Sequence, residues 1–170
     1  MLHLRTRHQL GQSIIETVVG IIFMIPIVLF LFDVAVLVLG NTANDNLAKQ
    51  SARAAASAVN SSATPPKGDI GVASTAARNI VTNFATSGFI DKVECAFIWY
   101  NDPNANTSQD LDTGPLGQAP SQARSTDPGA GNLAVVTGME VRAPVPFPFF
   151  DTHRTFWARA VEPIVAIPPQ

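Results

Sequence analysis

Residues 14–39 read IIETVVGIIFMIPIVLFLFDVAVLVL, and this apolar run decides the fold. Only Glu16, Thr17 and Asp33 in it are clearly polar. An α-helix rises about 1.5 Å per residue and the hydrocarbon core of a bilayer is about 30 Å thick, so about 20 apolar residues span it. The run therefore predicts a transmembrane helix over residues 14–39.

A secretory signal peptide is the first rival interpretation of this run. The apolar core of such a peptide has about 7–15 residues and is followed by a cleavage site of small residues. Here the core is longer, and the first small-residue site, around Gly40, comes late. We therefore expect the helix to be retained in the mature protein.

The charges on either side of the run predict its orientation. Arg5 and Arg7 precede it without any acidic residue, whereas Asp45 comes before Lys49 on the other side. Basic residues favour the cytoplasmic side of a membrane. We therefore expect a cytoplasmic N-terminus and an exported segment over residues 41–170.

The composition excludes several classes of function. Charged residues make up 14% of the chain, against about 25% in typical soluble domains. A net charge of −2 provides no general attraction to nucleic acid. The single cysteine, Cys95, excludes an intramolecular disulfide and a zinc site of four thiolates. Phosphate-binding, zinc-protease and serine-hydrolase motifs are absent from the sequence, so we expect no enzyme, no cofactor and no metal.

A short basic leader, residues 1–11, precedes Gln12 and Glu16. If a peptidase cut after Gly11, Gln12 would become the first residue and Glu16 the fifth. The new α-amino group would be cationic near neutral pH, because its reference pKa is about 7.7–8.0. Packed against a neighbouring subunit, this amine and the Glu16 carboxylate would neutralise each other, and such a pair fixes registry more surely than it adds stability.

Two carboxylates in an apolar run need an explanation, because each costs about 2.5–3.5 kcal/mol at the centre of a bilayer on insertion scales. We expect Asp33 to lie near the exit interface and to reach the lipid head groups. Glu16 has two interpretations. It reaches the head groups on the entry side, or it has a cationic partner of the kind just described.

The order of glycine, glutamate and apolar helix resembles the class III signal of type IV pilins and pseudopilins. A narrower resemblance is to the TadE-like minor pilins of the tight-adherence (Tad/Flp) pilus system. It is carried by GQSIIE (11–16) with Asp33 as a second acid, by the Ala-rich NLAKQSARAAASAV (46–59), and by TFWARAVEPIV (155–165) near the C-terminus.

This resemblance implies a structural, non-catalytic pilus subunit of the bacterial inner membrane that assembles into an adhesive surface fibre. Gly11 and Gln12 would be the processing residues, and Glu16 and Asp33 the assembly residues. The implied partners are the prepilin peptidase, other pilin subunits, the pilus assembly platform and inner-membrane lipid. The alternative is a single-pass, membrane-anchored extracytoplasmic binding or sensory module whose N-terminus is never cleaved.

Small residues recur at three- and four-residue spacing over residues 44–59, which is a helical period. We predict one long N-terminal helix over residues 12–59, although Gly40 and Asn41 could form a flexible joint. The small-residue face suits close approach of another helix. The competing interpretation is an ordinary amphipathic helix on the surface of a small domain.

The expected fold is α+β and pilin-like, with the long transmembrane helix followed by a small exported domain over residues 60–170. Residues 60–69 are rich in turn formers, and residues 70–87 read as a second helix with Val72 and Val81 buried. Alternating apolar residues predict strands over 92–100, 133–142 and 152–161, which would form a short antiparallel sheet.

The first of these strands carries Val93, Cys95, Phe97 and Trp99 at every second position, so we expect them on one face. Cys95 is then a buried apolar residue and not a nucleophile. The proline-rich stretch 143–150 is expected to be an extended connector that buries its phenylalanines.

Residues 101–132 contain almost no large apolar side chain and are expected to form a flexible, solvated loop. Oxygen-bearing residues alternate at its start: Asp102, Asn104, Asn106, Ser108 and Asp110. This spacing partly matches a calcium-binding loop, although Thr107 and Thr113 stand where such a loop has glycine and glutamate. A calcium site therefore stays the second interpretation of this segment.

Overall fold

The computed structural model describes residues 4–61, 70–84, 86, 88–102, 105–110, 116, 119–124, 127–145 and 151–164. Their elements are α1 (Leu4–Ser61), α2 (Ile70–Thr82), β1 (Ile90–Asp102), β2 (Ala105–Asp110), α3 (Ser121–Arg124), β3 (Asn132–Arg142) and β4 (His153–Pro163). The chain divides into two compact units, Met1–Ala35 and Val36–Gln170.

The first unit consists of the N-terminal part of α1. Pro26 lies inside the helix, and its ring removes one backbone hydrogen bond, which membrane helices tolerate. From Ser13 to Ala35 every side chain is exposed except that of Asp33. This part of the helix therefore presents an apolar surface on all sides.

In the second unit, α1 runs unbroken through Gly40 to Ser61, so the joint considered at Gly40 does not form. Its buried residues recur at helical spacing: Val36, Gly40, Asn44, Leu47, Ala48, Ser51, Ala52, Ala55 and Ala56. They pack in one core with apolar residues of the strands. The small-residue face is thus the inner face of an amphipathic helix on a small domain, which was the second of our two interpretations.

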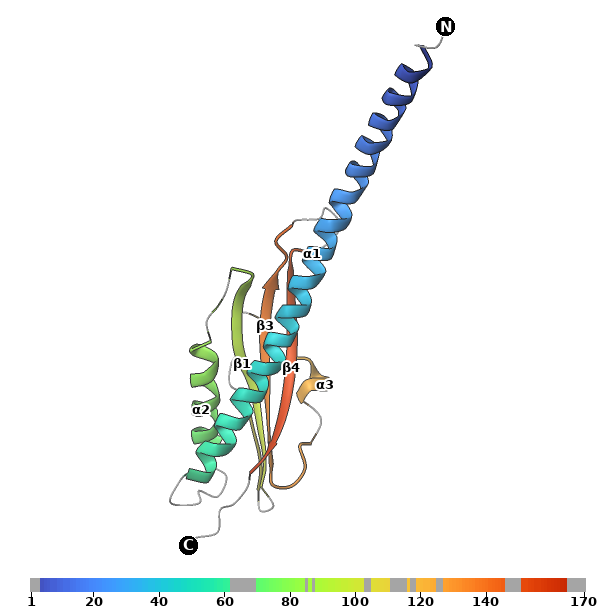
Figure 1. Cartoon of the computed structure of the whole chain (residues 1–170). Helices are drawn as coiled ribbons and strands as arrows, with labels where there is room; N and C mark the ends of the chain where they lie inside the picture. Colours follow the sequence, from blue (N-terminus) through green and yellow to red (C-terminus); the bar gives the residue numbers. More distant parts are fainter. Residues whose placement is uncertain are drawn as a thin grey trace. The chain divides into compact units, whose positions relative to one another are not determined.

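The second unit is built around a four-stranded antiparallel sheet with the strand order β2-β1-β3-β4. α1 and α2 supply the apolar residues that cover one face (Figure 1). On the other face, residues around α3 complete a smaller cluster with Phe97, Val136 and Trp157. The structure confirms the expected fold class, a long apolar helix followed by a second helix and a small antiparallel sheet.

α1 crosses this sheet in a defined register. Gly40 lies against Val141 near one end of β3, and the Arg53 side chain reaches Glu162 near the other end of β4. At Gly40 an added Cβ would come within 3.1 Å of Val141 Cγ1 and closer still to Cγ2. Glycine therefore sets how closely the helix can approach β3.

A β-bulge in β1 overturns the prediction that four alternating residues share one face. The pairing with β3 moves from Cys95↔Thr137 to Phe97↔Val136, so Ala96 is an extra residue. Cys95 packs in the core beneath the helices, whereas Phe97 packs in the opposite cluster. The bulge reverses the side of every later side chain, and Ile98 takes the core position that periodicity assigned to Phe97.

The end of α2, the burial of Val72 and the end of β4 also differ from the predictions. α2 ends at Thr82 and not at residue 87, and the amide of Phe84 donates to the Val81 carbonyl in a tight final turn (3.1 Å). In α2, Val81 is buried as expected, but Val72 is 38% exposed. β4 continues through Pro163, which an edge strand allows because one side of its backbone needs no hydrogen bond.

The segment expected to be a loop, residues 101–132, contains the edge strand β2 and the short helix α3. β2 pairs with the second half of β1, from Phe97↔Asp110 to Asp102↔Ala105. Its polar residues gave no apolar alternation to detect. Within the predicted connector 143–150, residues 146–150 lie outside the described part of the chain.

Candidate functional site: the apolar helix surface and its carboxylates

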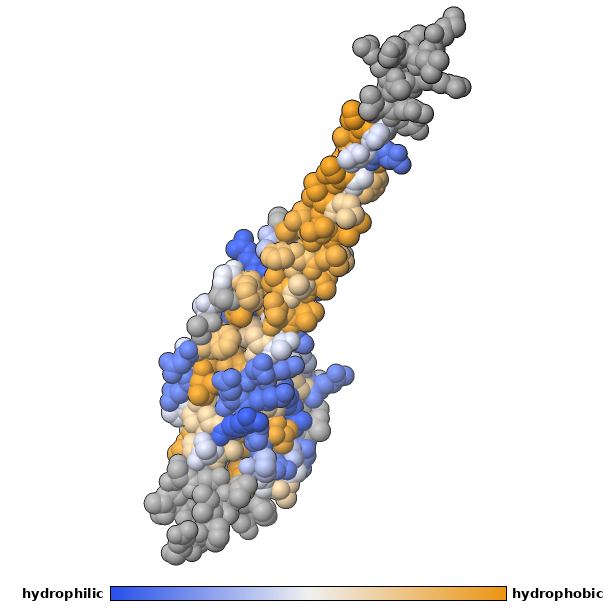
Figure 2. Space-filling view, in the orientation of Figure 1, coloured by the Kyte–Doolittle hydropathy of each residue, from blue (hydrophilic) through white to orange (hydrophobic). Residues whose placement is uncertain are grey.

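The most unusual surface of the protein is the apolar run of α1. Its large side chains are open to solvent, with Ile15 and Phe23 both 67% exposed. On the face drawn in Figure 2, apolar side chains cover this part of the helix almost without interruption. Folded monomers in water rarely expose so large an apolar area.

Among the described residues, one helix is long and apolar enough to cross a membrane, and it contains this run. Only 11% of its most apolar window is buried inside the protein, so it is not the core helix of a globular domain. A helix of this kind near an N-terminus is a membrane anchor or a signal sequence.

Glu16 places a carboxylate at the beginning of this apolar surface, with its side chain exposed. Beside it, the Thr17 hydroxyl donates to the Ser13 carbonyl (2.8 Å), so it is not available to the carboxylate as a donor. Among the described side chains no cation forms an ion pair with Glu16. Transfer of such a carboxylate into an apolar environment is costly unless a partner arrives with the transfer.

The predicted processing residues, Gly11 and Gln12, lie in the helical backbone of α1, and their side chains are outside the described part. Gln12 precedes Glu16 by four residues. Residues four apart lie on the same helix face, about 5–6 Å apart between Cβ atoms. An amine at residue 12 would therefore lie about one helical turn from the Glu16 carboxylate on the same face.

Asp33 differs from the expectation that it reaches head groups. Its side chain is 7% exposed, while its neighbours Phe32 (55%) and Val34 (39%) are open. Asp33 falls on the same helix face as Val36 and Gly40, the beginning of the buried stripe. The structure thus separates the two acids: Glu16 faces outwards and Asp33 is buried in the protein.

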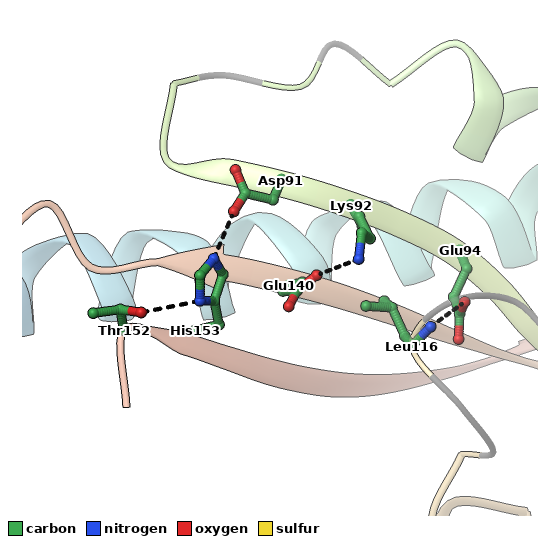
Figure 3. Close-up of polar contacts among 7 residues, drawn as sticks. All are labelled: Asp91, Lys92, Glu94, Leu116, Glu140, Thr152 and His153. Carbon is green, nitrogen blue, oxygen red and sulfur yellow. Dashed lines mark hydrogen bonds and ion pairs between the residues drawn. The ribbon is translucent and has the colours of Figure 1, made fainter. Parts of the chain in front are cut away.

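Charged side chains pair at the end of the sheet that lies near Gly40. His153 Nε2 lies 3.2 Å from Asp91 Oδ2, and Lys92 Nζ lies 3.3 Å from Glu140 Oε2 (Figure 3). His153 is exposed and begins β4. The first contact links β4 to β1 across β3, and the second joins the neighbouring strands β1 and β3. Neither contact brings a nucleophile, a base and an orienting group together.

Two other predicted sites can be placed. Cys95 is 2% exposed and packs in the main core, as expected for an apolar role. The calcium-type spacing falls on the β1–β2 hairpin; Asn104 and the side chains of Asp102, Asn106, Ser108 and Asp110 lie outside the described part. Alternate residues of a strand are about 6.6 Å apart in a line, whereas a calcium loop curls around the ion.

Two polar contacts were not predicted from the sequence. Asn44, fully buried in α1, donates to the carbonyls of Phe156 (2.9 Å) and Thr137 (3.4 Å), and accepts from the Thr137 hydroxyl (2.9 Å). Asp127 Oδ1 accepts from the Gly129 amide (2.8 Å) and from Asn101 Nδ2 (2.6 Å). The only sequence signal for Asn44 was a polar residue inside an otherwise small, apolar stripe.

The hydrogen bonds to Asp127 lower its pKa below the ordinary value of 3.8, with the Gly129 amide as the largest cause and Asn101 as the second. The carboxylate holds a turn in which Gly129 (φ 86°) and Gly131 (φ 75°) take the left-handed conformation. This turn leads into β3, and the Gly131 amide donates to the Asn101 carbonyl (2.8 Å). This turn therefore has a structural role: it holds the beginning of β3 beside the end of β1.

Comparisons with protein-family models, with curated proteins and with solved structures found no match to this chain.

Proposed function

We propose that this chain is a structural, non-catalytic pilus subunit of the TadE-like minor pilin or pseudopilin type. In this proposal prepilin peptidase cuts after Gly11, and the retained helix holds the subunit in the bacterial inner membrane until it enters a Tad/Flp-type pilus. One observation carries the proposal: an outward-facing carboxylate, Glu16, lies on an exposed apolar helix five residues after a glycine that ends a basic leader.

The proposed role of Glu16 follows from the energetics of its environment. A carboxylate among lipid tails or packed apolar helices costs about 2.5–3.5 kcal/mol on insertion scales. Cleavage would create a cation, the α-amine of Gln12, only four residues away. When Glu16 pairs with the amine of a neighbouring subunit, the cost of placing its carboxylate in an apolar environment is removed. This happens only when the two helices pack in one register, so the pair specifies that register.

The fold narrows the surface by which the proposed subunits would stack. From Val36 onwards the small-residue face of α1 is covered by the chain's own core. The exposed apolar side chains lie mainly between Ile14 and Leu39. We therefore assign helix packing to residues 12–39, a shorter segment than the 12–59 that the sequence suggested.

Substitution of the residue before the cleavage site tests the processing step. In a strain that expresses the peptidase, Gly11→Val should leave an uncut precursor, because a β-branched side chain replaces a hydrogen at the bond to be cut. Gly20→Val in the same helix is the control and should be processed normally. Intact-mass spectrometry of the membrane-extracted protein reads the N-terminus directly, and a wild-type chain that still begins at Met1 would contradict the proposal.

The same strain tests the assembly step. Glu16→Gln keeps the shape of the side chain but removes its charge, so we expect normal cleavage and loss of subunits from surface filaments in immuno-electron microscopy. Asp45→Asn, an exposed carboxylate of α1 outside the apolar run, is the matched control. Filaments that contain the Glu16→Gln subunit at the wild-type level would refute the assigned role.

The alternative proposal is a membrane-anchored extracytoplasmic binding or sensory module with an intact N-terminus. The exposed apolar helix joined to a folded α+β unit supports both proposals equally. The mass of the mature wild-type protein separates them, because the alternative requires that residues 1–11 remain.

A further inference from the structure

One end of the sheet lies beside the residues of α1 at which the apolar run stops. Val38 and Leu39, the last two residues of the run, are 60% and 59% exposed, and Gly40 then packs directly on Val141. Arg53, farther along the same helix, reaches Glu162 at the opposite end of β4. If residues 14–39 span a membrane, the end of the sheet at Val141 is therefore the end nearest the lipid.

Most of the charges at this end are already used. Lys92 pairs with Glu140, and His153 pairs with Asp91 (Figure 3). Two arginines remain, Arg142 at the end of β3 and Arg154 at the beginning of β4. Both are exposed, and among the described side chains neither has an ion-pair or hydrogen-bond partner.

The strand pairing places the two arginines on opposite faces of the same sheet end. In β3 the residues of the main core are Leu133, Val135, Met139 and Val141, so Arg142, which alternates with them, points away from α1. In β4 the core residues are Ala158 and Ala160, so Arg154 shares the side of α1. Arg154 is paired with Val141, the residue on which Gly40 rests.

We propose that Arg142 and Arg154 bind the phosphates of anionic lipid head groups at the membrane surface where α1 emerges. A guanidinium group presents a planar fork of donors that matches phosphate oxygens, and basic side chains next to a membrane are attracted to anionic lipid. Asp151, an exposed carboxylate three residues before Arg154, offsets part of the positive charge of the two arginines. The inference rests on the membrane anchoring within the proposed function, but not on cleavage or on pilus assembly.

Hydrogen-exchange mass spectrometry on the full chain in lipid nanodiscs tests the contact. One set of discs contains phosphatidylcholine alone, and a second set also contains phosphatidylglycerol. We expect amides near residues 141–145 and 151–155 to exchange about fivefold more slowly in the anionic discs, the factor for about one basic residue at such a surface. The variants Arg142→Gln and Arg154→Gln should each reduce this difference.

The matched control is Arg53→Gln, which removes one positive charge from the far end of the sheet and should leave the difference intact. Equal exchange at residues 141–145 and 151–155 in both kinds of disc, or a lipid dependence that survives both arginine substitutions, overturns the inference. The same data test the anchoring separately. If residues 14–39 exchange freely in the discs, the membrane helix itself is refuted; if they are protected, only the head-group contact is at issue.

Discussion

At the scale of single residues, Asn44 is the polar side chain on which the position of α1 depends. It joins the helix to β3 and β4 through bonds to Thr137 and Phe156, and both Asn44 and Thr137 are fully buried. A buried amide of this kind is satisfied in one register only, because a shift by one residue would leave its donors and acceptor without partners. Asn44 therefore specifies how the helix lies on the sheet.

We expect Asn44→Ala to lower the free energy of unfolding by about 1–3 kcal/mol, the cost of leaving a buried hydroxyl and carbonyl without their partner. Chemical unfolding of the full chain in mild detergent measures this loss. Thr137→Val and the double variant complete a double-mutant cycle, in which the two losses should be less than additive. Additive losses would mean that the two side chains do not depend on each other.

Asp127 makes the turn before β3 sensitive to acid. Its folded-state pKa is lowered, so its stabilising effect is complete above the ordinary value of 3.8 and is lost as the pH falls through the folded-state pKa. Asp127→Asn should remove that part of the acid sensitivity while keeping the shape of the side chain. The measurement is the midpoint of thermal unfolding, recorded at several pH values between about 5 and about 2. Asp45→Asn, in an exposed part of α1, should retain the wild-type profile.

Residue environments could be predicted from sequence where they depend on local periodicity. The burial of Cys95 follows from its place in an alternating strand. The roles of Asn44 and Asp127 depend on partners that are 93 and 26 residues away in the chain, and no local pattern identifies such partners. The exposure of Glu16 and the low exposure of Asp33 (7%) likewise have no signal in the local sequence pattern.

At the scale of elements, two of the glycines of α1, Gly20 and Gly40, lie in opposite environments. An added Cβ at Gly20 meets nothing within 4 Å, whereas at Gly40 it would strike the buried side chain of Val141. Alanine favours a helix by about 1 kcal/mol over glycine when space is free. The two positions therefore separate helix propensity from packing within one helix.

We expect Gly40→Ala to destabilise the full chain by about 1–3 kcal/mol, because overpacking exceeds the gain in helix propensity. Gly20→Ala should be neutral or slightly stabilising. The double variant Gly40→Ala/Val141→Ala should recover part of the loss, since it removes the methyl groups that the new Cβ would meet. Thermal unfolding in detergent compares all three, and a stable Gly40→Ala variant would show that the helix is free to move away from β3.

Periodicity predicted the elements whose patterns are uninterrupted. The small-residue spacing of α1 matches the observed burial. In β3 the alternate residues Val135, Met139 and Val141 lie in the main core, although both faces of this strand are covered. The face assignment in β1 was wrong beyond Cys95 because the bulge adds a residue, and no sequence pattern marks its position. β2 was missed because an edge strand with polar residues has no apolar alternation.

At the scale of the whole molecule, the exposed apolar run decides where the protein can be stable. We expect the wild-type chain to remain in the membrane fraction after alkaline carbonate treatment. The double substitution Ile22→Asp/Ile27→Asp should release it, since each buried carboxylate costs about 2.5–3.5 kcal/mol. Asn46→Asp/Gln50→Asp adds the same charges to exposed positions of the same helix and should leave the chain in the membrane. Release of the wild-type chain would contradict membrane anchoring.

The general architecture, a long helix with a small α+β unit, could be predicted from sequence. The length of an apolar run and the alternation of a strand each extend over many residues, so a single exception does not hide them. The sequence did not predict which part of α1 packs on the sheet and which part stays exposed. Sequence gives the helix one small-residue face, but the structure covers that face from Val36 onwards and leaves the earlier part open. Only tertiary packing determines which part of a long helix remains available to other molecules.

The extra residue Ala96 has a consequence for how this chain can change in length. On one side of it β1 contributes Cys95 to the layer beneath the helices, and on the other side Phe97 contributes to the opposite layer. Deletion of Ala96 would make Cys95 and Phe97 neighbours in a regular ladder, so Ile98 and Trp99 would keep their present sides of the sheet. Homologous chains that keep this fold should therefore tolerate a one-residue gap at Ala96, whereas a gap inside β4, which pairs with β3 without an extra residue, would turn the later side chains to the wrong face.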